Sequence, residues 1–299
     1  RKWLDRPIHI ISSNPHSVMN SLYAFAALKD EMPFSNLEEA ATALSHADNA
    51  HLRTMVEEYA VENGMYPLAD HSGTNIAVQI FDTTKVKTEL LPPAIKWDAA
   101  YLKEKKPLIL VMDYAFGEQA FEVMDELLKP YDNEVGKLPL NVESISIMGK
   151  AGILEGGKGD IMVPTAHVFE GTADNYPVEN DFCQADFEGH GLKVFEGTMI
   201  TVLGTSLQNK DILRYFSRSS WRAVGLEMEG AHYQKAIQAA SKIRKSINEN
   251  VTLRYAYYAS DNPLQTGHTL ASGSLGDEGV KPTYLITVKI LNRIGGLAD

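Results

Sequence analysis

Residues 222–231 read RAVGLEMEGA, and residues 255–264 read YAYYASDNPL. Each segment is an apolar, strand-forming run that ends abruptly in carboxylates, as buried parallel strands do where they deliver side chains to a sheet edge. Glu229 and Asp261 are 261 − 229 = 32 positions apart, which accommodates one helix and one return strand. We therefore expect two adjacent parallel strands that place Glu229 and Asp261 at the same carboxyl edge, facing one crevice.

The rest of the chain repeats this alternation of apolar strands and amphipathic helices. Strands are expected at 7–12, 75–81, 107–112, 142–148, 159–165 and 193–203, and helices at 17–28, 37–44, 51–62, 119–128, 209–217, 230–247 and 283–294. The polar segment 166–191 is expected to be a surface loop. We predict one α/β domain over 1–299, with a central twisted sheet, mixed and largely parallel, flanked by helices; residues 1–70 are partly a helical elaboration.

The composition excludes some classes of function. The chain has 299 residues, of which 44% are hydrophobic and 22% charged, so it can bury a sizeable core. Its net charge of −11 argues against general nucleic-acid binding, because phosphate backbones select basic surfaces. A small phosphorylated ligand needs only a few local cations, so that class of ligand stays open.

The number of cysteines indicates the redox compartment of the protein, and the spacing of the histidines indicates whether they can bind a metal. The single cysteine, Cys183, cannot form an intrachain disulfide, which fits a reducing, cytoplasmic location. No signal peptide is visible, and apolar runs such as Leu108–Met112 are too short to span a bilayer, so no membrane association is expected. His46 and His51 are five positions apart rather than the four that place two ligands on one helix face. We expect no metal and no cofactor.

The two carboxylate segments carry a family resemblance. Glu-Met-Glu at a strand-to-helix junction, followed about one unit later by Ser260-Asp261, resembles the nucleoside phosphorylase and nucleosidase superfamily. The run from Ser260 to Leu264, with Gly267-His268 just after it, resembles most narrowly the AMP nucleosidase and methylthioadenosine nucleosidase branch. The resemblance implies that Glu229 holds the ribose hydroxyls and that Asp261 donates a proton toward the purine. It also implies the three-layer fold of that family and a homo-oligomer.

A second pair of motifs supports the same resemblance and shows one departure from it. The segment 149–154 reads GKAGIL and is expected to form a glycine turn, and the later segment 159–164 reads GDIMVP. In the superfamily the turn carries a small hydroxyl residue that touches the phosphate or nucleophile and the sugar. Lys150 occupies that slot here. It is either a solvated loop lysine or a point charge for a phosphate group.

Each candidate residue also has a purely structural interpretation. Asp261 precedes Asn-Pro and could be a turn residue, whereas Glu229 and Glu227 could be acids that favour a helix N-terminus. Glu227 could also pair with Arg222. The other candidate substrate contacts are commonly core, surface or turn residues, and they are Gly149, Met228, Ser260, Arg214, Arg218, Phe116, His16 and His268.

These residues predict cleavage of the N-glycosidic bond of a purine nucleoside or nucleotide, AMP-like or adenosine-like. The bond breaks through an oxocarbenium-like state, so the leaving base needs a proton and the electron-poor sugar needs support. Hydrolysis is favoured over phosphorolysis because the segment 12–16, SSNPH, stands where the phosphorylases carry an arginine-bearing glycine loop. A phosphate-dependent phosphorylase and a non-catalytic nucleotide-binding regulatory protein are the alternatives.

Overall fold

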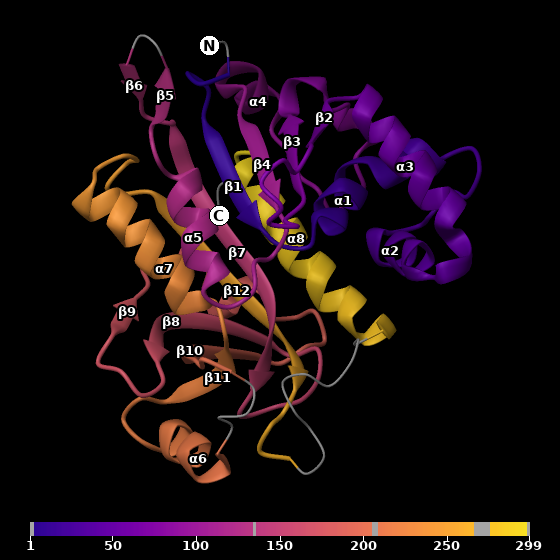
Figure 1. Cartoon of the computed structure of the whole chain (residues 1–299). Coiled ribbons are helices and arrows are strands. Elements are labelled where there is room, and N and C mark those ends of the chain that lie inside the picture. Colours follow the sequence, from indigo (N-terminus) through magenta and orange to yellow (C-terminus); the bar gives the residue numbers. More distant parts are fainter. Residues whose placement is uncertain (1–2, 134–135, 205–208, 266–275, 298–299) are drawn as a thin grey trace. The chain divides into compact units, whose positions relative to one another are not determined.

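The computed structural model of the chain describes residues 3–133, 136–204, 209–265 and 276–297. It contains two compact units (Figure 1). The terminal unit comprises Arg1–Tyr114 and Thr283–Asp299, and the central unit comprises Ala115–Pro282. Both units combine strands with covering helices, so the predicted α/β class with a mixed sheet flanked by helices is confirmed. That the chain is one domain stays a prediction.

The terminal unit has the strand order β1-β4-β3-β2, with β1 and β4 parallel and the other pairs antiparallel. Its first helix begins at Pro15, where the fixed φ of proline suits a first helical turn, and the Asn14 side chain accepts the N–H of His16. The elements are β1 (Ile8–Ser12), α1 (Pro15–Leu28), α2 (Leu37–Ser45), α3 (Ala50–Glu62), β2 (Met65–Leu68), β3 (Val78–Asp82), α4 (Ala99–Lys105), β4 (Leu108–Met112) and most of α8 (Val280–Ile294).

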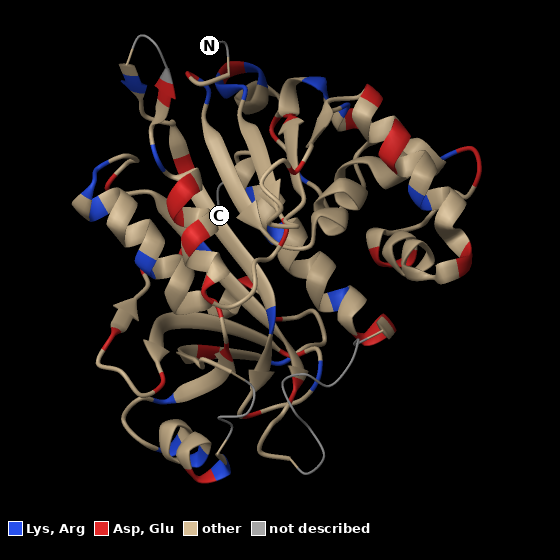
Figure 2. Ribbon diagram, in the orientation of Figure 1, with Lys and Arg blue, Asp and Glu red and all other residues tan. Residues whose placement is uncertain are grey.

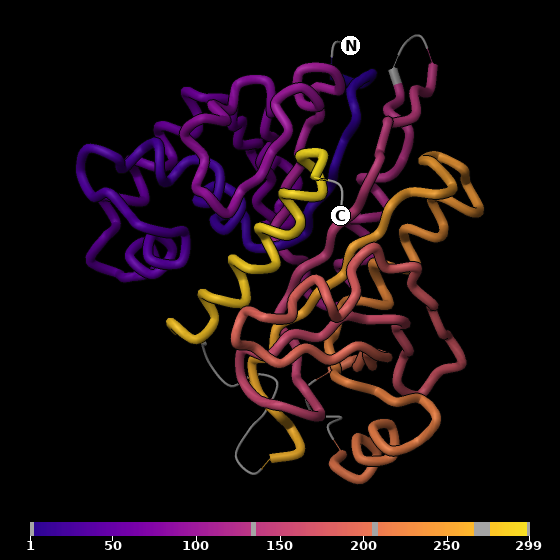
Figure 3. Tube along the Cα trace, turned by 180° about the vertical axis from the view of Figure 1, so that it is seen from behind, coloured from indigo at the N-terminus to yellow at the C-terminus, as the bar shows by residue number. Residues whose placement is uncertain are grey.

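The helix α8 lies beside α1 although the two are far apart in sequence (Figures 1 and 3). The Asn20 amide donates to the Tyr284 hydroxyl at 2.9 Å, and the Thr287 hydroxyl donates to the Ser17 hydroxyl at 3.1 Å. The predicted closing helix is therefore confirmed. The short elements β2 and α4 were not predicted, because four to seven residues carry too little periodicity.

The central unit contains a circuit of five strands. The order is β11-β10-β8-β12-β7, and β11 also pairs with β7, which closes the path. The elements are α5 (Gln119–Leu127), β5 (Tyr131–Asn133), β6 (Gly136–Leu138), β7 (Val142–Ile153), β8 (Ile161–Phe169), β9 (Asn175–Pro177), β10 (Val194–Thr201), α6 (Lys210–Arg218), β11 (Ala223–Glu227), α7 (Gly230–Gln238) and β12 (Thr252–Asp261).

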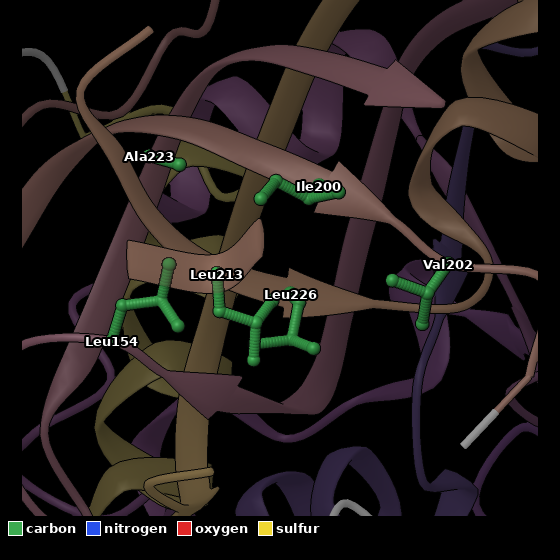
Figure 4. Close-up of a cluster of buried hydrophobic side chains, with 6 residues drawn as sticks. All are labelled: Leu154, Ile200, Val202, Leu213, Ala223 and Leu226. Atoms are coloured by element: carbon green, nitrogen blue, oxygen red, sulfur yellow. The ribbon is translucent and has the colours of Figure 1, made fainter. Parts of the chain in front are cut away.

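Closure of this circuit depends on Gly225 in β11. A Cβ atom there would lie 2.4 Å from Met162 Sδ and 2.7 Å from the carbonyl oxygen of Gly152 in β7. The two backbones therefore approach too closely for any side chain at this position. An apolar cluster joins β10, β11, α6 and the residue that follows β7 (Figure 4). Its members are Leu154, Ile200, Val202, Leu213, Ala223 and Leu226.

Three local predictions in the central unit were wrong. The expected glycine turn at 149–154 lies inside β7, because β12 and β11 pair with that strand up to Gly152 and Ile153. The expected helix 230–247 changes to a π-helical turn after Gln238. The expected loop 166–191 contains the end of β8 and the strand β9, because His167, Val168 and Phe169 are buried beneath neighbouring elements.

The net negative charge is spread over the helices and loops of both units (Figure 2). The helix α6 differs, since it carries three basic residues and one acidic residue, namely Lys210, Arg214, Arg218 and Asp211. Within the described parts of the chain, the helices are all too short or too polar to cross a bilayer.

Candidate active site

Glu227 caps the helix α7 from the strand that precedes it. Its Oε2 accepts the backbone N–H of Glu229 at 2.5 Å and that of Gly230. Its Oε1 accepts the hydroxyl of Thr201 at 2.5 Å, and the Thr201 oxygen accepts the N–H of Ala231 at 3.0 Å. These bonds satisfy three N–H groups that a helix N-terminus otherwise leaves without partners. Glu227 is fully buried at the end of β11, whereas Arg222 is exposed and directly precedes the first residue of that strand. The ion pair suggested between these two residues was therefore wrong.

Glu229 is the N-cap residue of α7, yet its side chain does not cap the helix. Its Oε1 accepts the N–H of Gly117 at 3.0 Å, and its Oε2 accepts the N–H of Met228 at 3.2 Å. Hydrogen bonds from backbone N–H groups favour the ionised form of a carboxylate. Because Glu227 does the capping, the Glu229 carboxylate is directed instead toward the segment that precedes α5.

The two acids differ in their environments. Burial and the nearby charge of Glu229 raise the pKa of Glu227 to about 8, against the opposing effect of the Thr201 hydroxyl and the two N–H groups. Glu227 therefore takes up a proton far more readily than an exposed glutamate does. Neighbouring acids in contrasting environments are typical of catalytic sites.

This raised pKa predicts a pH-dependent stability. The folded state binds a proton that the unfolded state releases near pH 4.5, so the stabilising contribution is complete below that pH and is lost as the pH rises toward about 8. The free energy of unfolding should fall by up to ~1.4 kcal/mol per pH unit over this window. In Glu227→Gln this slope should disappear, as measured by urea unfolding at several pH values. The exposed control Glu179→Gln should keep it; equal slopes in Glu227→Gln and wild type would contradict the assignment.

Asp261 is the last residue of β12 and is fully buried. The Ser260 hydroxyl donates to Asp261 Oδ1 at 2.6 Å and also lies 3.2 Å from the carbonyl oxygen of Ala151. The turn that follows is made by Asn262, whose Oδ1 accepts the N–H of Leu264 at 3.0 Å. The side-chain capping of this turn, which the sequence allowed for Asp261, is therefore carried out by Asn262.

The strand register relates the two acidic segments. Gly152 in β7 pairs with Leu226 of β11 on one side and with Asp261 of β12 on the other. The expectation that β11 and β12 are adjacent and parallel was wrong, because β7 lies between them and β11 runs antiparallel to it. The register still brings the ends of β11 and β12 to the same level, about 10 Å apart, which is two strand spacings.

The segment before α5 is fastened to α7 at two points. The Ala115 N–H donates to the Tyr233 hydroxyl at 3.0 Å, and the Gly117 N–H donates to Glu229. Phe116 lies between these two points and is 70% exposed. Phe116 therefore does not pack in the core, which was the structural alternative for it.

The remaining candidates are spread more widely. Met228 packs partly buried against the cluster of Figure 4, and Gly149 is buried within β7. Arg214 forms an ion pair with Asp211 one helical turn away at 2.8 Å, and Arg218 is exposed at the end of α6. His16 is exposed in the first turn of α1, in the terminal unit. His268 lies outside the described residues.

Lys150 is an exposed residue in the interior of β7. It pairs with Tyr258, whereas its neighbour Gly149 pairs with Tyr257. Because successive side chains of a strand point to opposite faces, Lys150 points away from the face on which Tyr257 meets α7. Its assignment to a phosphate group stays a prediction that this register does not favour.

Several buried polar residues behind the carboxylates were not predicted. His167 in β8 lies 3.1 Å from the Tyr257 hydroxyl through its Nε2, and its ring centre is 4.9 Å from that of Tyr255. The Tyr255 hydroxyl donates to Gln234 of α7 at 2.8 Å. The only signal in the sequence was the presence of polar side chains inside apolar strands. Among the described residues, no three His, Cys, Asp or Glu side chains are grouped to hold a metal ion.

The fold is similar to that of solved structures of two kinds of enzyme, a nucleosidase and a futalosine hydrolase. The 5′-methylthioadenosine/S-adenosylhomocysteine nucleosidase of Campylobacter jejuni is 11% identical over 98% of this chain and 100% of that chain, with a TM-score of 0.54. The Neisseria meningitidis enzyme of the same name is 8% identical over 96% and 99%, with a TM-score of 0.54. A futalosine hydrolase mutant of Helicobacter pylori strain 26695 is 11% identical over 97% and 99%, with a TM-score of 0.51.

These likenesses confirm the fold that the resemblance of the sequence motifs implied. The chain belongs to DUF6909, a family of unknown function whose family model matches residues 41–295. No curated protein sequence matches the chain.

Proposed function

We propose that this protein is an enzyme that hydrolyses the N-glycosidic bond of a purine nucleoside. The observation that carries the proposal is that two buried acids in different environments lie at the ends of two strands of the same circuit. Glu229 is held as an acceptor by backbone N–H groups, and Asp261 is fully buried at the end of β12. The register around Gly152 brings their segments to one level of the strand circuit.

Glu229 serves the sugar in this mechanism. An ionised carboxylate accepts hydrogen bonds from ribose hydroxyls, and such charge-assisted bonds are stronger than neutral ones. As the bond to the base breaks, positive charge develops on the sugar, and a nearby negative charge stabilises it.

Asp261 serves the leaving base. Burial at a strand end favours the protonated form of a carboxyl group, which can then donate to a purine nitrogen. Ser260 orients the carboxyl group through Oδ1, so we assign to Ser260 a positioning role rather than a direct contact with substrate.

The nucleophile is water in this proposal. The segment Ser12–His16 closes β1 and opens α1 without an arginine that could hold inorganic phosphate. The similar solved structures are named nucleosidases and a futalosine hydrolase, and the Neisseria meningitidis structure holds methylthio-immucillin-A. Adenosine and 5′-methylthioadenosine are therefore the first substrates to test. A homo-oligomeric state and a cytoplasmic location remain predictions.

The experiment is an HPLC assay for free base released from adenosine, 5′-methylthioadenosine and AMP, with and without phosphate. Release without phosphate supports hydrolysis. Release that requires phosphate and yields ribose 1-phosphate identifies a phosphorylase instead. Binding of these ligands without any release identifies a nucleotide-binding regulatory protein, and the proposed activity is then wrong.

Lys150 provides a test of the substrate's 5′ group. Because Lys150 points away from the face that meets α7, we expect Lys150→Met to leave KM and kcat unchanged for both adenosine and AMP. The matched control is Lys158→Met, which removes an exposed lysine from the next loop. A rise in KM for AMP alone, absent in the control, would show that Lys150 binds a 5′-phosphate and that the enzyme selects nucleotides.

A further inference from the structure

The first residue of α7 rests directly on two aromatic side chains. A Cβ atom on Gly230 would lie 2.3 Å from His167 Cδ2, 2.5 Å from His167 Nε2 and 2.7 Å from the Tyr257 hydroxyl. No real Cβ atom tolerates such distances, so the helix backbone touches the hydrogen-bonded pair of His167 and Tyr257. Glu229 directly precedes Gly230, and the capping acid Glu227 lies three positions before it.

The contact continues along the helix. One turn after Gly230, the side chain of Gln234 accepts the hydroxyl of Tyr255, and the ring of Tyr255 packs on His167. We call His167 and Tyr257 the aromatic platform. Both tyrosines belong to β12, the strand that ends in Asp261. One strand therefore carries Asp261 and also supports the helix whose N-cap residue is Glu229.

We propose that the aromatic platform is a positioning device, in which His167 and Tyr257 set the position of the first turn of α7 and thereby fix the Glu229 carboxylate relative to Asp261. The roles of the two acids rest on the proposed function. The platform itself rests only on the contacts among Gly230, His167 and Tyr257.

The chemistry of His167 suits this task. It is fully buried, and burial lowers the pKa of its imidazole to about 3, so the ring is neutral at physiological pH. A neutral ring in a dry, close-packed environment is a stiff support. A misplacement of about 1 Å in a catalytic group can reduce the rate ~10²-fold.

The first test adds a methyl group at Gly230, where the helix contacts His167 and Tyr257. Gly230→Ala should push the first turn of α7 away from the platform, although alanine is normally favoured over glycine in helices. We expect kcat for base release to fall ~10- to 10²-fold, with a smaller change in KM. The amide resonance of Gly117, which donates to Glu229 Oε1, should shift in the ¹H–¹⁵N spectrum.

A double-mutant cycle separates positioning from general damage. In a His167→Ala background the added methyl group of Gly230→Ala no longer meets the imidazole and keeps only its contact with the Tyr257 hydroxyl, so its effect on kcat and on the Gly117 resonance should be smaller than in wild type. Tyr255→Phe is the matched control. It also removes a tyrosine hydroxyl through which β12 contacts α7, but that hydroxyl binds Gln234, one helical turn further from Glu229. It should leave the Gly117 resonance and kcat near wild type.

Two outcomes would overturn the proposal. One is a Gly230→Ala protein whose Gly117 resonance and kcat are both unchanged. The other is strict additivity in the cycle. If Gly230→Ala does not fold, Tyr257→Phe takes its place, since it keeps the ring and removes the hydroxyl that touches Gly230 and His167. A wild-type protein without base release would refute the proposed function, whereas the Gly117 resonance would still decide whether the platform positions Glu229.

Discussion

Asp261→Asn should abolish most base release while leaving ligand binding in place. Asparagine keeps an oxygen that can accept the Ser260 hydroxyl, so the local geometry should persist. What it loses is the proton that the leaving purine needs. Loss of a positioned general acid typically reduces the rate ~10²–10⁴-fold. The measurement is single-turnover release of free base by HPLC, alongside calorimetric titration of the same nucleoside.

The matched control is Asp181→Asn. Asp181 forms an ion pair with Arg254 at 2.7 Å near the start of β12, so its replacement also neutralises an aspartate bound to that strand. We expect this control to lower the thermal midpoint slightly and to leave base release unchanged. If Asp261→Asn turned over at a rate close to wild type, Asp261 would have no place in the mechanism.

Glu229→Gln should lower kcat/KM far more for ribosides than for 2′-deoxyribosides. A riboside offers two neighbouring hydroxyls to the carboxylate, and a 2′-deoxyriboside offers one. Hydrogen bonds to a charged group contribute roughly 1.5–3 kcal/mol each. The loss in kcat/KM should therefore be ~10- to 10²-fold greater for adenosine than for 2′-deoxyadenosine. Steady-state kinetics on this pair of substrates provide the measurement.

Glu118→Gln controls for the loss of charge in this test. Glu118 follows Gly117 and is exposed, so its replacement removes a negative charge close to the N–H that binds Glu229. Glu118→Gln should reduce kcat/KM slightly, and by the same factor for both substrates. Equal losses for both substrates in Glu229→Gln would mean that Glu229 does not contact the 2′-hydroxyl and serves only to hold the backbone at Gly117 and Met228.

The sequence by itself determined the class of fold and the two acidic segments. Apolar runs such as Leu108–Met112 and Tyr255–Asp261 become strands because their side chains must be buried, and Pro15 begins a helix because its φ angle suits one. These are local effects of hydrophobicity and backbone geometry. The position of carboxylates at strand ends likewise indicated where the chemistry should be sought.

Only the tertiary structure decided which acid caps the helix and which is directed toward the proposed site. Sequence spacing could not show that β7 separates β11 from β12, because strand order depends on contacts between distant segments. It could not show that Glu227 caps α7 and so directs Glu229 toward Gly117, because that division requires Thr201 from another strand. Lys150 looked like a turn residue, but pairing on both sides of β7 made it part of a strand. His167 gave no functional signal in the sequence, since its contact with Gly230 exists only where two strands and a helix meet.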